Sequence, residues 1–315
     1  MIKKINGAID SAKNIAIFFH INPDGDAIGS SLALKFALTK MGKNVDVYSQ
    51  DKIEENYSLI DAQKHIITEI TNKQYDLGIV VDCPELKRIG TMSKVFGNCK
   101  TSMNIDHHLN NSNFADIVLS KPTASSTCEI IFELFKKLKI DFTEEIYKCL
   151  YTGLITDSGC FMYNLTDNLY KFAGECCKHI NAEEINFHFL REKSLSQLKL
   201  YALGLSSIEV HFNNFLATIV ISNRDLKASN TSYDDTSGLV YLFGGLKGVK
   251  VVALLCEEKL GEYKVSFRSR EVDVCKIAEI FVGGGHKFAS GCKIYGTKNT
   301  AKKVLLNKIE TYLKG

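Results

Sequence analysis

The sequence predicts an α/β protein in which a doubly wound parallel sheet is joined by a helical linker to a smaller α/β domain. Short apolar runs alternate with segments of helical spacing in the first half, which is the pattern of parallel strands connected by helices. Near residue 200 the pattern changes to strand-like runs interrupted by glycines. The length of 315 residues also fits two domains better than one.

The first domain is predicted over residues 1–185. Its strands are expected where short apolar runs occur, at residues 15–19, 45–48, 77–81 and 102–105. Its main helices are expected at residues 27–41, 125–138 and 144–156. Gly42 is suited to cap the first of these helices at its carboxyl end. Strands and helices therefore alternate as a parallel sheet requires.

The linker is predicted over residues 186–205, with one amphipathic helix near 192–205, and the second domain over 206–315. The expected elements of this domain are strands at 208–220, 249–256 and 263–268 and a last helix at 300–313. Gly244, Gly245 and Gly248 interrupt the chain between the first two strands. The second half is therefore expected to be the smaller α/β domain.

Composition narrows the classes of function and the compartment. The net charge of +3 permits a phosphate-bearing ligand, whereas a protein that coats long duplexes would carry a larger basic excess. No apolar run is long enough to span a bilayer, and no secretory h-region follows the start. The ten cysteines form no C-x-x-C pair, so we expect free thiols in a reducing cytoplasm.

The first chemical motif follows the strand predicted at residues 15–19. His20, Asp24 and Asp26 lie there beside Gly-Ser, and two carboxylates so close repel each other unless a cation joins them. Oxygen-rich ligation with some histidine suits Mn, Mg or Fe better than a zinc–thiolate site. For one acid, a polar loop with an Asp N-cap would be the better interpretation. The combination favours a metal site.

Three more polar groups follow predicted elements of the same domain. Asp82 ends one apolar strand, Asp106-His107-His108 follows the next, and Asp157 follows the helix at 144–156. Each alone is also compatible with an ordinary polar turn or helix end. Ligands bind outside the carboxyl ends of parallel strands, so these groups are expected to share one edge with the first motif.

Together these motifs supply five aspartates and three histidines. That number is enough for two cations about 3.5–4 Å apart with one shared carboxylate, the arrangement that hydrolyses phosphoesters and phosphoanhydrides. The sequence therefore predicts a two-metal hydrolase.

The second domain carries a basic motif. Arg268 and Arg270 end a predicted strand, and the run 282–287 (VGGGHK) reads as a glycine-rich loop that finishes with basic residues. The glycines alone would more commonly be a flexible turn. With two arginines and His286, a clamp for a phosphate or nucleotide is the better interpretation.

These motifs, in this order, resemble the DHH phosphoesterase superfamily. Asp106-His107-His108 is its signature, and GGGHKFASG at residues 283–291 is similar to its C-terminal DHHA1 domain. The resemblance covers nearly the whole chain and is to the small, two-domain NrnA type, an oligoribonuclease that is also a pAp (3′-phosphoadenosine 5′-phosphate) phosphatase. One departure is Val282, where many relatives carry a fourth glycine.

The resemblance implies a role for each motif. The first domain would be the catalytic DHH domain and the second the substrate-binding DHHA1 domain. The implied ligands of one Mn are His20 and Asp24, those of the other are Asp26, His107 and Asp157, and Asp82 bridges them. His108 would contact the scissile phosphate with Asp106 behind it. The residues implied in gripping the nucleotide are Arg268, Arg270, Gly284, Gly285 and His286, and Ser125 and Ser126 would support the site.

The expected activity is Mn-dependent hydrolysis of short oligoribonucleotides such as pApA to mononucleotides, and of pAp to AMP. The expected partners are short RNA or small nucleotides, without a membrane or a long duplex, and a homodimer is compatible with the sequence. Two alternatives stay open: a soluble cyclic-di-AMP phosphodiesterase or phosphatase for pAp alone, and a nucleotide-binding regulatory protein with a relict site. Every expected metal-ligand position is occupied by Asp or His, which counts against a relict site.

Overall fold

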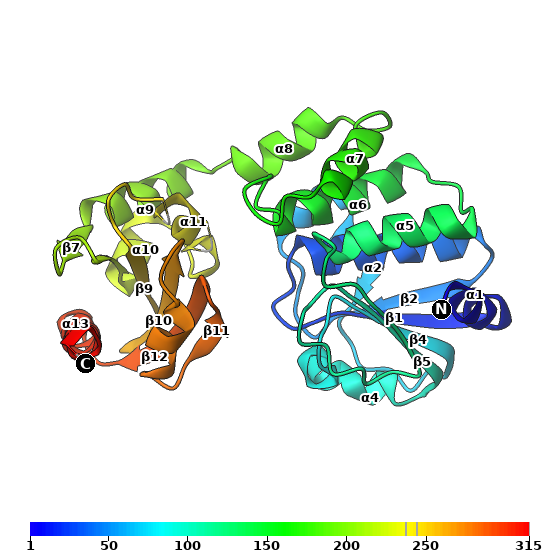
Figure 1. Ribbon diagram of the computed structural model, residues 1–315, viewed down its shortest axis with the longest axis horizontal. Coiled ribbons are helices and arrows are strands. Elements are labelled where there is room, and N and C mark those ends of the chain that lie inside the picture. Colours follow the sequence, from blue (N-terminus) through cyan, green and yellow to red (C-terminus); the bar gives the residue numbers. More distant parts are fainter. Residues whose placement is uncertain (237, 244, 315) are drawn as a thin grey trace. The chain divides into compact units, whose positions relative to one another are not determined.

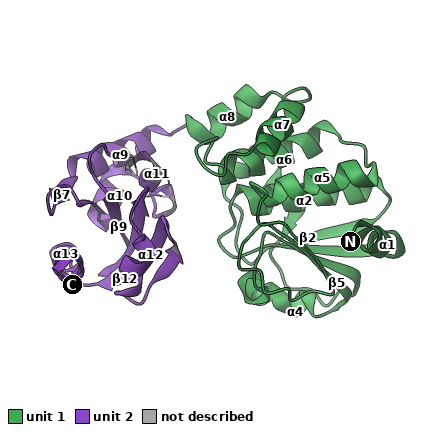
Figure 2. Cartoon of the chain, viewed as in Figure 1, with its two compact units in different colours: residues 1–192 green, residues 193–315 purple. Residues whose placement is uncertain are grey.

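The computed structural model describes residues 1–236, 238–243 and 245–314, arranged as two compact units (Figure 2). The first unit comprises residues 1–192 and the second residues 193–315. The three-part division into 1–185, 186–205 and 206–315 stays a prediction. Each unit has its own sheet and its own hydrophobic core.

The first unit is built on a parallel sheet of six strands with the order β3-β2-β1-β4-β5-β6. Strands β1, β2, β4 and β5 of this sheet are labelled in Figure 1. The strands are β1 (Asn14–Phe18), β2 (Asn44–Tyr48), β3 (Ile66–Ile67), β4 (Tyr75–Val81), β5 (Cys99–Asp106) and β6 (Ile117–Ser120). The chain adds strands on one side of β1, then returns to add β4 on its other side. The predicted doubly wound sheet is confirmed, and its topological switch point lies between β1 and β4.

Helices cover both faces of this sheet. The helical elements are α1 (Ile2–Ser11), α2 (Gly25–Lys40), η1 (Glu55–Ile60), α3 (Ala62–His65), η2 (Leu86–Met92), α4 (Ser93–Phe96), α5 (Thr127–Leu138), α6 (Glu144–Asp157), α7 (Asp167–Cys176) and α8 (Ala182–Leu190). Strand β1 shows why both faces are apolar: Ile15 and Ile17 join the core under α2, α5 and α6, whereas Ala16 and Phe18 join the core under η2 and α4.

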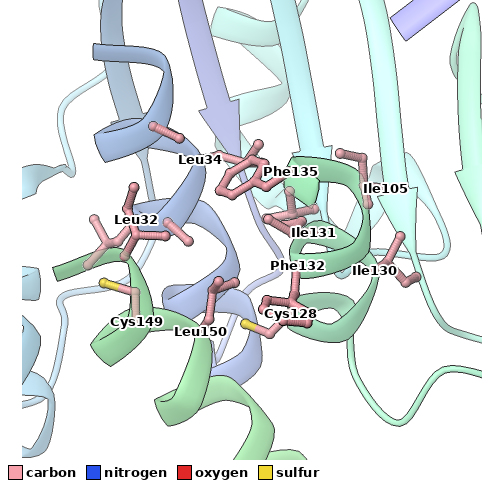
Figure 3. Packing of buried hydrophobic residues seen from close by; sticks show 14 of the residues in the cluster. Leu32, Leu34, Ile105, Cys128, Ile130, Ile131, Phe132, Phe135, Cys149 and Leu150 are labelled. Atoms are coloured by element: carbon pink, nitrogen blue, oxygen red, sulfur yellow. The ribbon is translucent and has the colours of Figure 1, made fainter. Parts of the chain in front are cut away.

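The larger core holds α2, α5 and α6 together above the sheet. Figure 3 shows Leu32 and Leu34 of α2, Cys149 and Leu150 of α6, and a group from α5 that packs near Ile105 of β5. Helices α2 and α6 approach closely because Gly29 faces the Cys149 carbonyl oxygen, where a methyl group would overlap it. This close approach brings the first turn of α2 near the end of α6.

The second unit has a mixed six-stranded sheet with the order β11-β12-β10-β9-β8-β7. Its strands are β7 (Glu209–His211), β8 (Leu216–Ile221), β9 (Val251–Lys259), β10 (Glu262–Ser269), β11 (Gly284–His286) and β12 (Ala289–Tyr295). Its helical elements are α9 (Leu195–Ser206), α10 (Asn223–Ser229), η3 (Asp234–Thr236), α11 (Leu239–Phe243), α12 (Val274–Glu279) and α13 (Lys298–Lys314). Among the described strands of this second unit only β8 and β9 pair in parallel, whereas the strands of the first unit's sheet are all parallel.

Two predicted elements of the second unit differ in the structure. The strand expected at 208–220 is a hairpin, β7 and β8, because Phe212, Asn213 and Asn214 adopt positive φ angles that reverse the chain. The glycine-rich run expected as a loop forms in part the edge strand β11. Gly244, predicted to interrupt the chain, lies outside the described residues.

The ten cysteines are free thiols. None of the helices in the described part of the chain combines the length and the apolar character that crossing a bilayer requires.

Candidate functional site

The polar motifs of the first unit gather at the carboxyl edge of its sheet, at the switch point. His20 follows β1, Asp82 follows β4, and Asp106 ends β5. Asp26 lies in the first turn of α2, and Asp157 is the last residue of α6. The edge and its covering helices can be followed in Figure 1. The residues predicted from separate motifs thus come together from adjacent strand ends and two packed helices.

Asp82 lies at the centre of this group and is 2% exposed. Its Oδ2 is 3.4 Å from His20 Nε2, and its Oδ1 is 3.5 Å from His107 Nε2. The residue adopts a left-handed backbone with a φ of 52°, a conformation that Asp tolerates better than most residues and that recurs at functional sites. The two carboxylate oxygens therefore face different histidines.

His20 and Asp24 form one side of the site. His20 Nδ1 lies 2.9 Å from the carbonyl oxygen of Ile21, which can only accept, so Nδ1 carries the hydrogen. Nε2 is then the nitrogen that faces Asp82 and Asp24, whose Oδ1 is 3.9 Å away. Asp24 also caps α2 by accepting from the N–H groups of Asp26 and Ala27. Its side chain is 56% exposed and so faces solvent.

Asp26, His107 and Asp157 form the other side. Both oxygens of Asp26 accept backbone N–H groups at the start of α5, from Thr127 at 2.6 Å and Cys128 at 2.9 Å. His107 Nε2 is 3.6 Å from Asp157 Oδ2. That oxygen is buried and has no hydrogen-bond partner among the described residues. A buried carboxylate oxygen without a donor is suited to a cation.

His108 is held by a chain of side chains that begins in the sheet. Its Nδ1 donates to Asp106 Oδ1 at 2.7 Å, and Asp106 Oδ2 accepts from Asn111 Nδ2 at 2.6 Å. Asn111 also donates to Asn104, which is fixed by carbonyl oxygens of Val80 and Cys83. Because Nδ1 is engaged by Asp106, Nε2 is the nitrogen of His108 that can meet a substrate.

The crowding of buried charges shifts the ionisation of these groups. Burial, followed by the charge of Asp82, raises the pKa of Asp26 to about 7. Burial and the charge of Asp26 raise the pKa of Asp157 well above its ordinary value. Burial alone would lower the pKa of His20, but its hydrogen bond to Asp82 and the Asp82 charge raise it to about 9. The carboxylates therefore repel one another when no cation is bound.

Three sets of side chains have ligand atoms that lie within 4.8 Å of one another: His20–Asp24–Asp82, Asp26–His107–Asp157 and Asp82–His107–His108. Carboxylate oxygens with imidazole nitrogens suit divalent ions such as Mn, Mg or Fe. With the unpartnered oxygen of Asp157, the donor set fits bound divalent metal ions.

Two residues with no role in the sequence prediction contact the site. Thr127 donates its hydroxyl to Asp82, and Asn111 donates to Asp106. The local sequence pattern does not distinguish them, because their contacts join residues that are brought together only by the fold. The one available signal is that Thr127 follows the Ser-Ser pair and Asn111 lies shortly after the His-His pair. Ser126 caps α5 and Ser125 donates to Glu129, so both support that helix.

The predicted nucleotide-gripping residues lie in the second unit. Arg268 is on β10 opposite Ala289 of β12, and its Nη1 donates to the Phe267 carbonyl oxygen. Arg270 is exposed just beyond β10. Gly284 and Gly285 pair with β12 as part of β11, where a side chain on Gly285 would overlap Ser290. The backbone of His286 pairs with Ala289, while its side chain lies outside what the structure describes.

Comparison with known proteins identifies the family. Residues 14–154 match the DHH family N-terminal domain, and residues 213–315 match the DHHA1 domain. The chain is 30% identical over 300 residues to the probable bifunctional oligoribonuclease and PAP phosphatase NrnA of Streptococcus mutans, which covers 93% of each chain. It is 26% identical over 304 residues to the bifunctional oligoribonuclease and PAP phosphatase NrnA of Bacillus subtilis, which covers 95% of each.

A solved structure gives the same result for the fold. The crystal structure of an exopolyphosphatase-related protein from Bacteroides fragilis is 31% identical, with a TM-score of 0.92 over 99% of this chain and 96% of that one. The resemblance inferred from the motifs is confirmed. The chain therefore belongs to the DHH family of phosphoesterases, with a DHH domain followed by a DHHA1 domain.

Proposed function

We propose that this hydrolase is an Mn-dependent enzyme that cleaves short oligoribonucleotides to mononucleotides and converts pAp to AMP. One ion would be held by His20, Asp24 and Asp82. The second would be held by Asp26, His107 and Asp157 together with Asp82, which would belong to both ligand sets. The proposal draws on the relatives named as oligoribonuclease and PAP phosphatase, which match more than nine-tenths of the chain.

One observation carries the two-ion assignment. The two oxygens of Asp82 face different histidines, His20 at 3.4 Å and His107 at 3.5 Å, and each histidine has a second carboxylate nearby. A buried carboxylate with one oxygen in each of two ligand groups is what a bridging ligand requires. A single-ion site would need only one of these groups.

The side chains around the ions would divide the remaining work. Bound divalent ions would supply charge neutralisation on the phosphate and activation of water. His108 would donate from Nε2 to a phosphate oxygen or to the leaving oxygen. Asp106 would hold the proton of His108 on Nδ1 and stabilise the imidazolium, and Asn111 would keep Asp106 oriented.

The basic residues of the second unit support a nucleotide substrate. Arg268 and Arg270 would pair with a second phosphate, and the N–H groups of Gly284 and Gly285 would lie against it. A small phosphate-binding site of this kind suits a dinucleotide or pAp rather than a long duplex. The free thiols of the chain support the cytoplasm as the compartment.

The test is a timed digest of labelled RNAs from dinucleotides upward, with pAp and cyclic-di-AMP alongside, in Mn and in Mg. We expect pApA and pAp to be hydrolysed fastest in Mn, with mononucleotides as the products of short RNA. Cleavage of cyclic-di-AMP much faster than pApA would assign the site to cyclic dinucleotides instead. No turnover of any phosphoester would favour a regulatory protein with a relict site.

A further inference from the structure

Helix α5 begins at the metal-binding edge and holds one carboxylate directly. Asp26 accepts the backbone N–H of Thr127 through Oδ2 at 2.6 Å and that of Cys128 through Oδ1 at 2.9 Å. Asp26 and Thr127 are both 0% exposed. These bonds fix the plane of the Asp26 carboxylate relative to the start of α5.

Thr127 also contacts the central carboxylate through its side chain. Its hydroxyl donates to Asp82 Oδ1 at 3.1 Å, and Oδ1 is the oxygen that faces His107. A donor on Oδ1 restricts rotation of the Asp82 carboxylate and therefore helps to keep Oδ2 toward His20. One residue thus touches two carboxylates that come from different elements, the loop after β4 and the first turn of α2.

Capping of α5 does not account for this hydroxyl. Ser126 is the N-cap residue, and its Oγ accepts the N–H of Glu129 at 3.1 Å. Threonine is branched at Cβ, which leaves few side-chain rotamers in a helix, so its hydroxyl is already directed before a ligand arrives. A hydroxyl that helix α5 does not need for its cap is directed at the proposed bridging ligand.

We propose that Thr127 is a positioning residue that orients Asp82 and Asp26 for metal binding, through its hydroxyl and its backbone N–H. This inference rests on the proposed function in so far as those carboxylates bind the ions. Groups that hydrogen-bond to metal ligands typically contribute about 10- to 100-fold to metal affinity or activity. The loss of the hydroxyl should therefore weaken metal binding without removing a ligand.

The test compares Thr127→Val, which keeps the shape and the N–H, with Thr127→Ser, which keeps a hydroxyl. Thr152→Val is the matched control, because Thr152 is 0% exposed in the same unit and its hydroxyl has no hydrogen-bond partner among the described residues. Mn affinity is measured without substrate from the electron paramagnetic resonance signal of free Mn²⁺. Turnover of pApA is then measured over a range of Mn concentrations, and thermal unfolding confirms that each variant folds.

We expect Thr127→Val to raise the Kd for Mn by about 10-fold or more, and Thr127→Ser and Thr152→Val to remain near the wild-type value. Turnover by Thr127→Val should recover when Mn is raised, which a purely structural defect would not show. Wild-type Mn affinity in a folded Thr127→Val variant would overturn the inference. If the wild-type chain binds Mn but cleaves none of the nucleotides, the proposed function fails while the positioning role stands. If the wild-type chain binds no Mn, both fail.

Discussion

At the scale of single residues, the proposed catalytic role of His108 can be tested separately from metal binding. Its Nδ1 is engaged by Asp106, whereas His107 directs Nε2 at Asp82 and Asp157. We expect His108→Ala to lower kcat for pApA by about 10²- to 10⁴-fold, the usual contribution of a general acid, while Mn stoichiometry is unchanged. His179→Ala serves as the control, because His179 stacks on Tyr147 away from the site. Loss of bound Mn together with activity in His108→Ala would make His108 a ligand.

Val282 adopts a left-handed backbone conformation whose energetic cost can be measured. It follows α12 with a left-handed φ of 58° and is 98% exposed, so a branched side chain sits in a conformation suited to glycine and packs against little. The left-handed conformation costs a non-glycine residue about 1–2 kcal/mol. Glycine avoids this cost, but its greater conformational entropy in the unfolded chain offsets part of the gain. Val282→Gly should raise the free energy of unfolding by about 1 kcal/mol in a urea titration.

Leu260→Gly is the matched control for that substitution. Leu260 is 92% exposed in the turn between β9 and β10, and its backbone does not have a positive φ angle. Glycine there should give no stabilisation and a small loss, because it only adds entropy to the unfolded chain. Equal effects of the two substitutions would contradict the assignment of strain to Val282.

At the scale of elements, the contact between α2 and α6 positions two of the proposed ligands. Gly29 of α2 faces the Cys149 carbonyl oxygen of α6, and a methyl group there would overlap backbone, which cannot turn aside. We expect Gly29→Ala to separate the helices, lower stability by about 1–3 kcal/mol, and weaken Mn binding because Asp26 and Asp157 move apart. Thermal unfolding and Mn titration measure the two effects.

Gly174→Ala provides the comparison within a helix. Gly174 lies in α7 with open space around its missing side chain, so alanine should stabilise that helix by up to about 1 kcal/mol and leave Mn binding unchanged. Tight Mn binding in Gly29→Ala would show that the site does not depend on this helix contact.

The elements also show what the sequence could and could not predict. His20 and Asp82 were predictable as neighbours because each follows an apolar strand, and parallel strands bring their carboxyl ends to one edge. Thr127 and Asn111 were not, because their bonds to Asp82 and Asp106 depend on the packing of α5 and on a loop path. The sequence predicts one strand at 208–220 because apolar residues occur on both sides of Asn213 and Asn214. These two residues are typical of turns, and in the structure they divide the stretch into the hairpin of β7 and β8.

At the scale of the whole molecule, the buried charges link stability to pH. Asp26 has a pKa raised to about 7 and His20 one raised to about 9, so the folded chain holds protons that the unfolded chain has released. Stability therefore falls as pH rises through these values. The contribution of Asp26 is complete below its ordinary pKa of 3.8. That of His20 is complete below its ordinary value of 6.5.

We expect the metal-free protein to have a lower Tm at pH 8.5 than at pH 6. Saturating Mn should reduce that difference, because a cation replaces the protons and binding stabilises the folded state more at high pH. Calorimetric scans at both pH values, with and without Mn, measure this. A metal-free Tm that does not change between pH 6 and pH 8.5 would mean that the carboxylates are not held together as described.

Asp82 is proposed to hold two metal ions together in one phosphoesterase site. The most direct measurement is Mn stoichiometry by equilibrium dialysis, made on the wild-type chain and on Asp82→Asn, together with turnover of pApA. We expect the wild-type chain to bind two Mn ions. A folded Asp82→Asn variant should bind fewer Mn ions with lower affinity, and its turnover should fall to background. Two tightly bound Mn and unchanged turnover in Asp82→Asn would contradict this role of Asp82.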